Sequence, residues 1–84
     1  MGEWIDDLAE ACGQQPLSDT ETAALLLIAR EVAHRVERKG TPLAAFLLGM
    51  HVRERAADGT PREEALSTGI AVIERLLPPT PDQP

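Results

Sequence analysis

The sequence predicts an all-α fold, a compact four-helix domain with helices at about 3–12, 19–38, 42–57 and 61–77 and a proline-rich C-terminal tail. Three observations predict it. Apolar residues recur at helical spacing in each of these segments. Ala and Leu dominate the apolar residues, as helices prefer, whereas β-branched residues are too scattered to form alternating strands. Finally, residues that start or stop helices bound each segment. We expect one helical domain at 1–77 and a flexible tail at 78–84.

The first segment predicts an amphipathic helix that stops at Gly13. At 100° per residue, four acidic side chains share one side, which we expect to be solvated. The opposite, apolar side consists of Trp4, Ile5, Leu8, Ala11 and Cys12. We expect this side to face the core. Cys12 is therefore expected to be a small buried residue rather than a nucleophile, since the helix around it is acidic.

The second segment begins with a capping box, Ser18-Asp19-Thr20-Glu21, in which a hydroxyl and a carboxylate each satisfy a free backbone N–H. The expected core side of this helix consists of Leu25, Leu26, Ile28, Ala29, Val32, Ala33 and Val36. The last two helices are expected to start at Thr41-Pro42 and Thr60-Pro61, each a cap followed by proline. The second of these starts also reads as a capping box with Glu63. Gly69 is expected to mark a close approach between helices.

The third helix is apolar on two opposite sides. One stripe consists of Leu43, Phe46, Leu47 and Met50, and the other of Ala45, Leu48, Gly49, Val52 and Ala56. Either the other helices wrap this helix, or one stripe is left exposed for another chain. For self-association, the candidate residues are Ala45, Leu48, Val52 and Ala56.

The outer face of the second helix carries the other candidate site. Arg30, His34 and Arg38 follow i, i+4, i+8 spacing, and Leu27 lies on the same face. One interpretation is a solvated face, with Glu31 and Arg35 as a surface ion pair. The other is a docking or anion-binding surface, because arginine pairs with carboxylates and phosphates.

Charge and motif content exclude several classes of function. The net charge of −6 disfavours a nucleic-acid partner, which would require a basic face. The single cysteine excludes an intrachain disulfide, and a metal site at His34 and His51 would need the fold to bring them together. No catalytic arrangement or glycine-rich phosphate loop is present. We therefore expect a protein that is not an enzyme and needs no cofactor or metal. Without a signal peptide or membrane-spanning run, it is expected to be cytoplasmic.

The runs 29–38 and 41–49, with the opening Glu3-Trp4-Ile5-Asp6, Leu8 and Cys12, resemble a small actinobacterial helical domain family of unknown function. The resemblance covers most of the chain through Met50 and fades across the last helix. Members of that family occur alone or C-terminal to a molybdenum-cofactor guanylyltransferase, the enzyme that attaches GMP to molybdopterin. The resemblance implies an accessory role near molybdoenzyme cofactor maturation. It does not imply the transferase activity, which belongs to a separate nucleotide-binding domain.

Together these observations predict a non-enzymatic interaction module that binds a protein partner or a second copy of itself. The alternative is a small domain that holds an anion or a phosphorylated cofactor against Arg30, His34 and Arg38.

Overall fold

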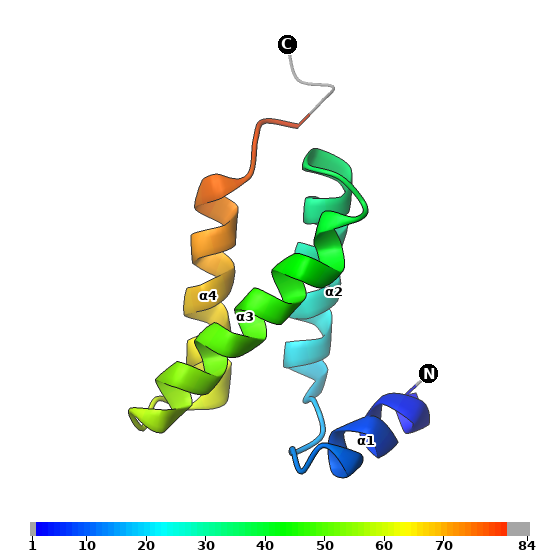
Figure 1. The fold of residues 1–84 in the computed structure, drawn as a ribbon, viewed down its shortest axis with the longest axis vertical. Coiled ribbons are helices and arrows are strands. Elements are labelled where there is room, and N and C mark those ends of the chain that lie inside the picture. Colours follow the sequence, from blue (N-terminus) through cyan, green and yellow to red (C-terminus); the bar gives the residue numbers. More distant parts are fainter. Residues whose placement is uncertain (1, 81–84) are drawn as a thin grey trace.

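The computed structural model of the protein describes residues 2–80 and confirms the all-α, four-helix class, with no strand in that range. The helices are α1 (Gly2–Ala11), α2 (Asp19–Arg35), α3 (Gly40–Ala57) and α4 (Arg62–Leu76). α2 and α4 lie side by side and run in the same direction, and α3 crosses both of them diagonally (Figure 1). No described helix is both long and apolar enough to cross a membrane.

α3 and α4 approach each other closely at Gly69, as the sequence predicts. A Cβ atom added to this buried residue would lie 2.5 Å from Cδ1 of Leu48 and 2.8 Å from Cδ2 of His51. Carbon atoms do not pack at such distances, so Gly69 lets the two helices approach within the reach of these side chains. This close approach fixes α3 across α4, and Leu48 of α3 is buried where the two helices meet.

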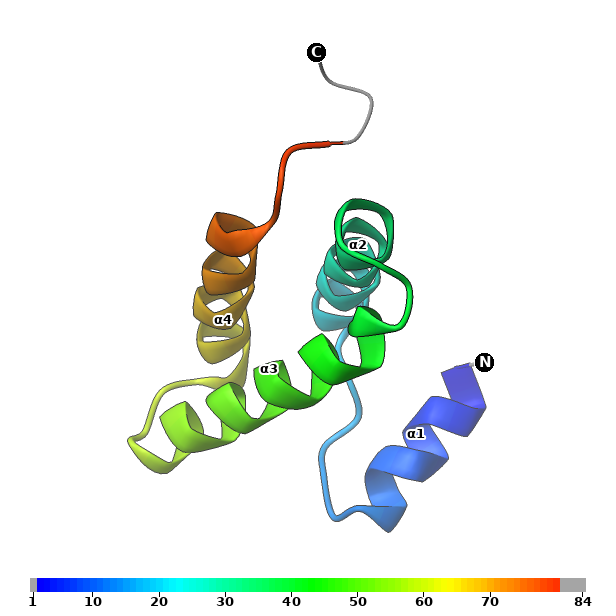
Figure 2. The same ribbon diagram turned by 45° about the horizontal axis from the view of Figure 1, so that its top comes forward.

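α1 stands apart from the rest of the fold. It packs against none of the other three helices and lies to one side of the start of α2 (Figures 1 and 2). None of its residues is buried: Trp4 is 65% and Leu8 44% exposed, and Cys12 is exposed as well. The expectation that this side faces the core, with Cys12 inside, is wrong. The linker after Gly13 leads α1 away from the surfaces on which an amphipathic helix would pack.

The core is correspondingly small. Its buried apolar residues are Ile28, Val32, Leu48, Ala65 and Leu66, and none of the described large side chains is fully buried. Leu26 and Val36, expected on the core side of α2, are 57% and 56% exposed. Because α3 covers only one side of α2, apolar residues at the edges of the predicted core face remain in contact with solvent.

The starts of α3 and α4 differ from the predicted threonine caps. α3 already begins at Gly40, and the Thr41 hydroxyl donates a 3.4 Å hydrogen bond to the carbonyl of Ala29 on α2. α4 has Pro61 at its N-cap position and no side-chain cap. The predicted Thr60–Glu63 capping box is therefore wrong: the Glu63 carboxylate instead accepts a hydrogen bond of 2.8 Å from the Ser18 hydroxyl. At both starts, contacts with α2 replace the local cap.

α2 ends at Arg35, three residues before the predicted end at Arg38. The early end lets α3 turn back and place Gly40 beside Val32, so that a Cβ atom added to Gly40 would lie 3.7 Å from Cγ1 of Val32. The chain leaves α4 at Leu77, and Arg35 Nε donates a 2.8 Å hydrogen bond to the carbonyl of Pro78. The first residue of the predicted tail thus contacts α2, while residues 81–84 of that tail lie outside the described residues.

Candidate interaction surface

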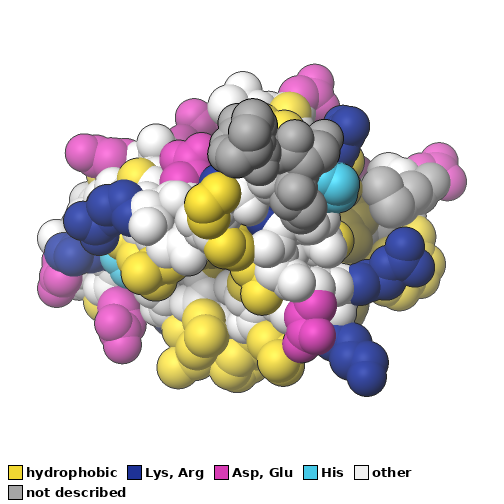
Figure 3. Space-filling model, turned by 90° about the horizontal axis from the view of Figure 1, so that it is seen from above, with side chains coloured by type: hydrophobic (Ala, Val, Ile, Leu, Met, Phe, Trp, Pro, Cys, Tyr) yellow, Lys and Arg dark blue, Asp and Glu magenta, His cyan; other side chains and the backbone are white. Residues whose placement is uncertain are grey.

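The outward side of α3 is an exposed apolar stripe. Its members recur at i, i+3, i+4 and i+7, which places them on one side of the helix. They are Leu43 (67% exposed), Phe46 (69%), Leu47 (65%) and Met50 (49%). Seen from above, apolar side chains gather along the edge of the molecule on which α3 lies (Figure 3). We call these four residues the α3 stripe. Contiguous exposed apolar side chains of this kind are typical of protein interfaces.

The residues predicted for self-association lie on the opposite side of α3. Leu48 is buried and Val52 is half-buried against the other helices, while Ala45 and Ala56 are exposed. The buried Leu48 is therefore not available to another chain. The sequence did indicate the α3 stripe, but not which of the two sides faces inward. Leu48 faces inward, where it packs against Gly69 of α4, and the bulky side chains of the α3 stripe remain outside.

An apolar groove continues the α3 stripe toward α4. Its volume is about 240 Å³, and Leu47, His51, Val72 and Leu76 are among the residues that line it. Val72 and Leu76 are themselves 38% and 79% exposed. The exposed apolar surface thus extends from α3 across the gap to α4. His51 Nε2 is buried here and has no hydrogen-bond partner among the described residues.

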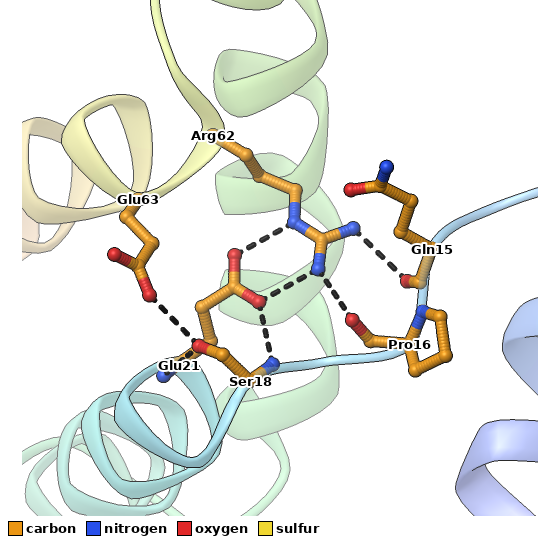
Figure 4. Close-up of polar contacts among 6 residues, drawn as sticks. All are labelled: Gln15, Pro16, Ser18, Glu21, Arg62 and Glu63. Atoms are coloured by element: carbon orange, nitrogen blue, oxygen red, sulfur yellow. Dashed lines mark hydrogen bonds and ion pairs between the residues drawn. The ribbon is translucent and has the colours of Figure 1, made fainter.

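The main polar cluster of the described residues holds the start of α2 against the start of α4 (Figure 4). Arg62 Nε and Nη2 donate to the two carboxylate oxygens of Glu21 at 2.6 and 2.7 Å. The same guanidinium donates to the carbonyls of Gln15 and Pro16 at 3.0 and 2.7 Å. The predicted capping box is confirmed, since Ser18 and Glu21 exchange bonds of 2.8 and 3.1 Å. The linker from α1 is therefore fixed from Gln15 onward.

Glu21 is only 3% exposed, yet it stays ionised because its charge is paired. The hydrogen bond from Arg62 lowers the pKa of Glu21 below its ordinary value, against the opposing effect of burial. The same hydrogen bond raises the pKa of Arg62. Sequence reasoning identified Glu21 as a cap but missed Arg62, which lies 41 residues away along the chain. The hydrogen bonds of Glu21 and Arg62 thus hold parts of the fold together.

The outer face of α2 is only partly as predicted. Leu27 is 61% exposed and Arg30 and His34 are exposed, but Arg38 lies beyond the end of α2. The predicted i, i+4, i+8 ridge is therefore interrupted after His34. The Glu31–Arg35 ion pair is confirmed at 3.2 Å.

The charges next to Leu27 are acidic. The shallow pocket beside it, of about 190 Å³, is lined by the carboxylates of Glu31 and Glu74 as well as by apolar residues. Within residues 2–80, no three acidic, histidine or cysteine side chains gather as metal ligands would. The α2 face thus carries mixed charge, unlike the uniformly apolar α3 stripe.

Comparison with known proteins identifies the family of the chain. A family model described as "Domain of unknown function (DUF6457)" matches residues 1–83. The match includes α4, across which the resemblance noted in the sequence fades. Neither the curated proteins nor the solved structures yielded a match.

Proposed function

Since the chain belongs to the DUF6457 family of domains of unknown function, we propose its function from its surface: it is a non-catalytic module that binds protein through the α3 stripe. The observation that carries this proposal is the exposure of Leu43, Phe46 and Leu47, each about two-thirds accessible on one side of a single helix. Burying such a side chain contributes about 1.5–3 kcal/mol. An interface over this stripe therefore gains most of its free energy from a few central residues.

Site-specific photo-crosslinking in cells tests this proposal without assuming a partner. A photoreactive amino acid at position 47 is expected to give discrete adducts of higher mass. Position 27 on the outer face of α2 is the matched control, since Leu27 and Leu47 are the same residue type and 61% and 65% exposed. Absence of any adduct at position 47, or equal adducts at both positions, would contradict the proposal.

The resemblance noted in the sequence adds a candidate partner, a molybdenum-cofactor guanylyltransferase. In this proposal the domain is an accessory protein of molybdenum-cofactor maturation. Isothermal titration calorimetry of the domain with the purified guanylyltransferase tests it. We expect binding by the wild type and by Leu27→Glu, and a loss of binding in Leu47→Glu. No heat of binding with the wild type would eliminate this partner.

A second candidate function is anion binding on α2. It is favoured by Arg30 and His34, both exposed and neither in an ion pair or hydrogen bond within residues 2–80. Arginine presents a fixed fork of donors to a phosphate or carboxylate. An NMR titration with guanosine monophosphate is expected to shift the amides around Arg30 and His34, and Arg30→Glu to abolish those shifts. The nearby carboxylates of Glu31 and Glu37 oppose an anion, so we rank this function second.

A further inference from the structure

We propose that the occupant of the α3 stripe is a second copy of this chain, and that each copy lays the apolar side of its α1 on the α3 stripe of the other. This inference rests on the proposed function and names the partner of the same surface. Three observations support it: the accessible area of the chain, an α1 that packs on none of the other helices, and the distribution of charge.

The accessible surface exceeds that of a compact monomer. The chain exposes 6508 Å², whereas a folded monomer of 9.1 kDa is expected to expose about 4,900 Å². Even if the five residues outside the described range each contributed a full extended-chain surface of about 160 Å², an excess of about 800 Å² would remain. About 800 Å² per partner is the area that a standard stable protein interface buries.

Two exposed apolar surfaces contribute to this area, and they belong to different parts of the fold. One is the α3 stripe with its continuation on α4, and the other is the side of α1 that carries Trp4 and Leu8. α1 is ten residues long, about 15 Å, which matches the length needed to cover residues 43–50 of a facing helix. The family model includes α1, so this helix is part of the matched domain.

Arg62 limits the surfaces that α1 can reach in its own chain. It holds the carbonyls of Gln15 and Pro16 at the start of α2, so only a few linker residues remain free after α1. The α3 stripe begins near the opposite end of α2, a helix of 17 residues or about 26 Å. α1 is thus held away from its own stripe and pointed outward (Figure 2). In a two-fold symmetric pair, the same outward position presents α1 to the stripe of the second copy.

The two surfaces carry opposite charges at the start of the α3 stripe. Residues 1–17 carry four acidic side chains and no Lys or Arg. The α3 stripe, in contrast, is preceded by Lys39, while Arg53 and Glu54, of opposite sign, follow it on the same side of the helix. Both cations are exposed. Opposite charges at the rim of an apolar contact fix its register and accelerate its formation.

The chain carries its own probe for this contact, because Trp4 is its single tryptophan and lies on α1. Light scattering of the full chain at about 100 μM is expected to give twice the monomer mass of 9.1 kDa. On dilution, the Trp4 emission is expected to move to longer wavelength as the dimer dissociates. Leu47→Glu should weaken dimerisation about 30-fold or more and expose Trp4. Leu27→Glu, the matched control, should change neither quantity.

A mixing experiment tests the exchange of α1, in which each copy lays its α1 on the α3 stripe of the other. Leu8→Glu on α1 and Leu47→Lys on α3 are each expected to be monomeric, because both contacts of the symmetric dimer then carry the substitution. In a mixed dimer one contact is wild type and the other pairs Glu with Lys. Mixing the two variants is therefore expected to restore the dimer mass. Circular dichroism checks that each variant is folded, as expected for exposed positions.

Three results would overturn the exchange. They are a wild-type monomer at 1 mM, a dimer whose Trp4 emission does not respond to Leu47→Glu, and a mixture of the two variants that stays monomeric. The proposed function fails separately, when photo-crosslinking at position 47 gives no adduct of any kind. Adducts at position 47 with a different protein, together with a monomeric wild type, would keep the interaction module and eliminate the second copy as its occupant.

Discussion

Arg62 on α4 donates hydrogen bonds to both carboxylate oxygens of Glu21 on α2, at 2.6 and 2.7 Å. The pair joins two helix starts that lie 41 residues apart, and Glu21 at the same time caps α2 through the backbone N–H of Ser18. A charged hydrogen-bonded pair is stronger than a neutral one, and the buried carboxylate depends on it. This contact fixes both the α2–α4 arrangement and the direction in which α1 leaves the domain.

Replacing Arg62 is expected to destabilise the domain. Arg62→Met preserves much of the aliphatic side chain but leaves the Glu21 carboxylate, which is 3% exposed, without its cation. The side chain of Arg62 is 31% exposed, so solvent screens part of the interaction and we expect a loss of about 2 kcal/mol. Urea unfolding at pH 7 and at one fixed protein concentration measures it. Arg75→Met, on the same helix but without an ion pair in the described residues, is the control and should change stability by less than about 0.5 kcal/mol.

The same pair predicts an acid-dependent part of the stability. The pKa of Glu21 is lowered below its ordinary value of 4.5 in the folded state, so below pH 4.5 the unfolded chain binds more protons than the folded one. The stabilisation is therefore complete above pH 4.5 and is lost as the pH falls through the folded-state pKa. Glu21→Gln should be less stable than wild type at pH 7, and the difference between them should shrink toward pH 3. Unfolding free energies that differ by the same amount at every pH would contradict this assignment.

Replacing glycine by alanine is expected to have opposite effects on stability at two positions, Gly69 and Gly49. Gly69→Ala would place a Cβ 2.5 Å from Cδ1 of the buried Leu48, so we expect it to destabilise the domain by about 1–3 kcal/mol. Gly49→Ala in α3 meets no atom within 4 Å and is expected to stabilise it by about 0.5–1 kcal/mol, since alanine favours a helix. Thermal unfolding of both variants measures the two signs. A stabilising Gly69→Ala would show that α3 and α4 pack less closely than described.

Local signals explain how much of the fold could be predicted. Helical periodicity predicts all four helices. The Ser18–Glu21 capping box and the end of α1 at Gly13 are also predicted correctly, because these features depend on neighbouring residues. The threonine caps of α3 and α4 were wrong because long-range partners replaced the local bonds. Thr41 bonds to Ala29 of α2, and Glu63 accepts a hydrogen bond from Ser18.

The candidate surface could be predicted only in part, for the same reason. Periodicity shows that α3 has two apolar sides, but only the packing against Gly69 determines that Leu48 faces inward and Leu47 outward. An amphipathic pattern likewise indicates that the side of α1 with Trp4 should be buried, without indicating by which chain. The helix ends, which determine whether Arg38 continues the α2 ridge, depend on where α3 turns back.

His51 provides a last prediction, about the groove between α3 and α4. Its Nε2 atom is buried without a hydrogen-bond partner among the described residues, and such an atom costs about 1–3 kcal/mol of desolvation. His51→Leu removes the unsatisfied nitrogen and places an apolar side chain among Leu47, Val72 and Leu76. We expect the variant to be about 1 kcal/mol more stable, a rise of about 4–8 °C in Tm. His34→Leu, at an exposed position on α2, is the control and should leave the Tm nearly unchanged. A His51→Leu variant less stable than wild type would show that Nε2 has a partner in solution, such as an ordered water molecule, and that the groove is polar at this point.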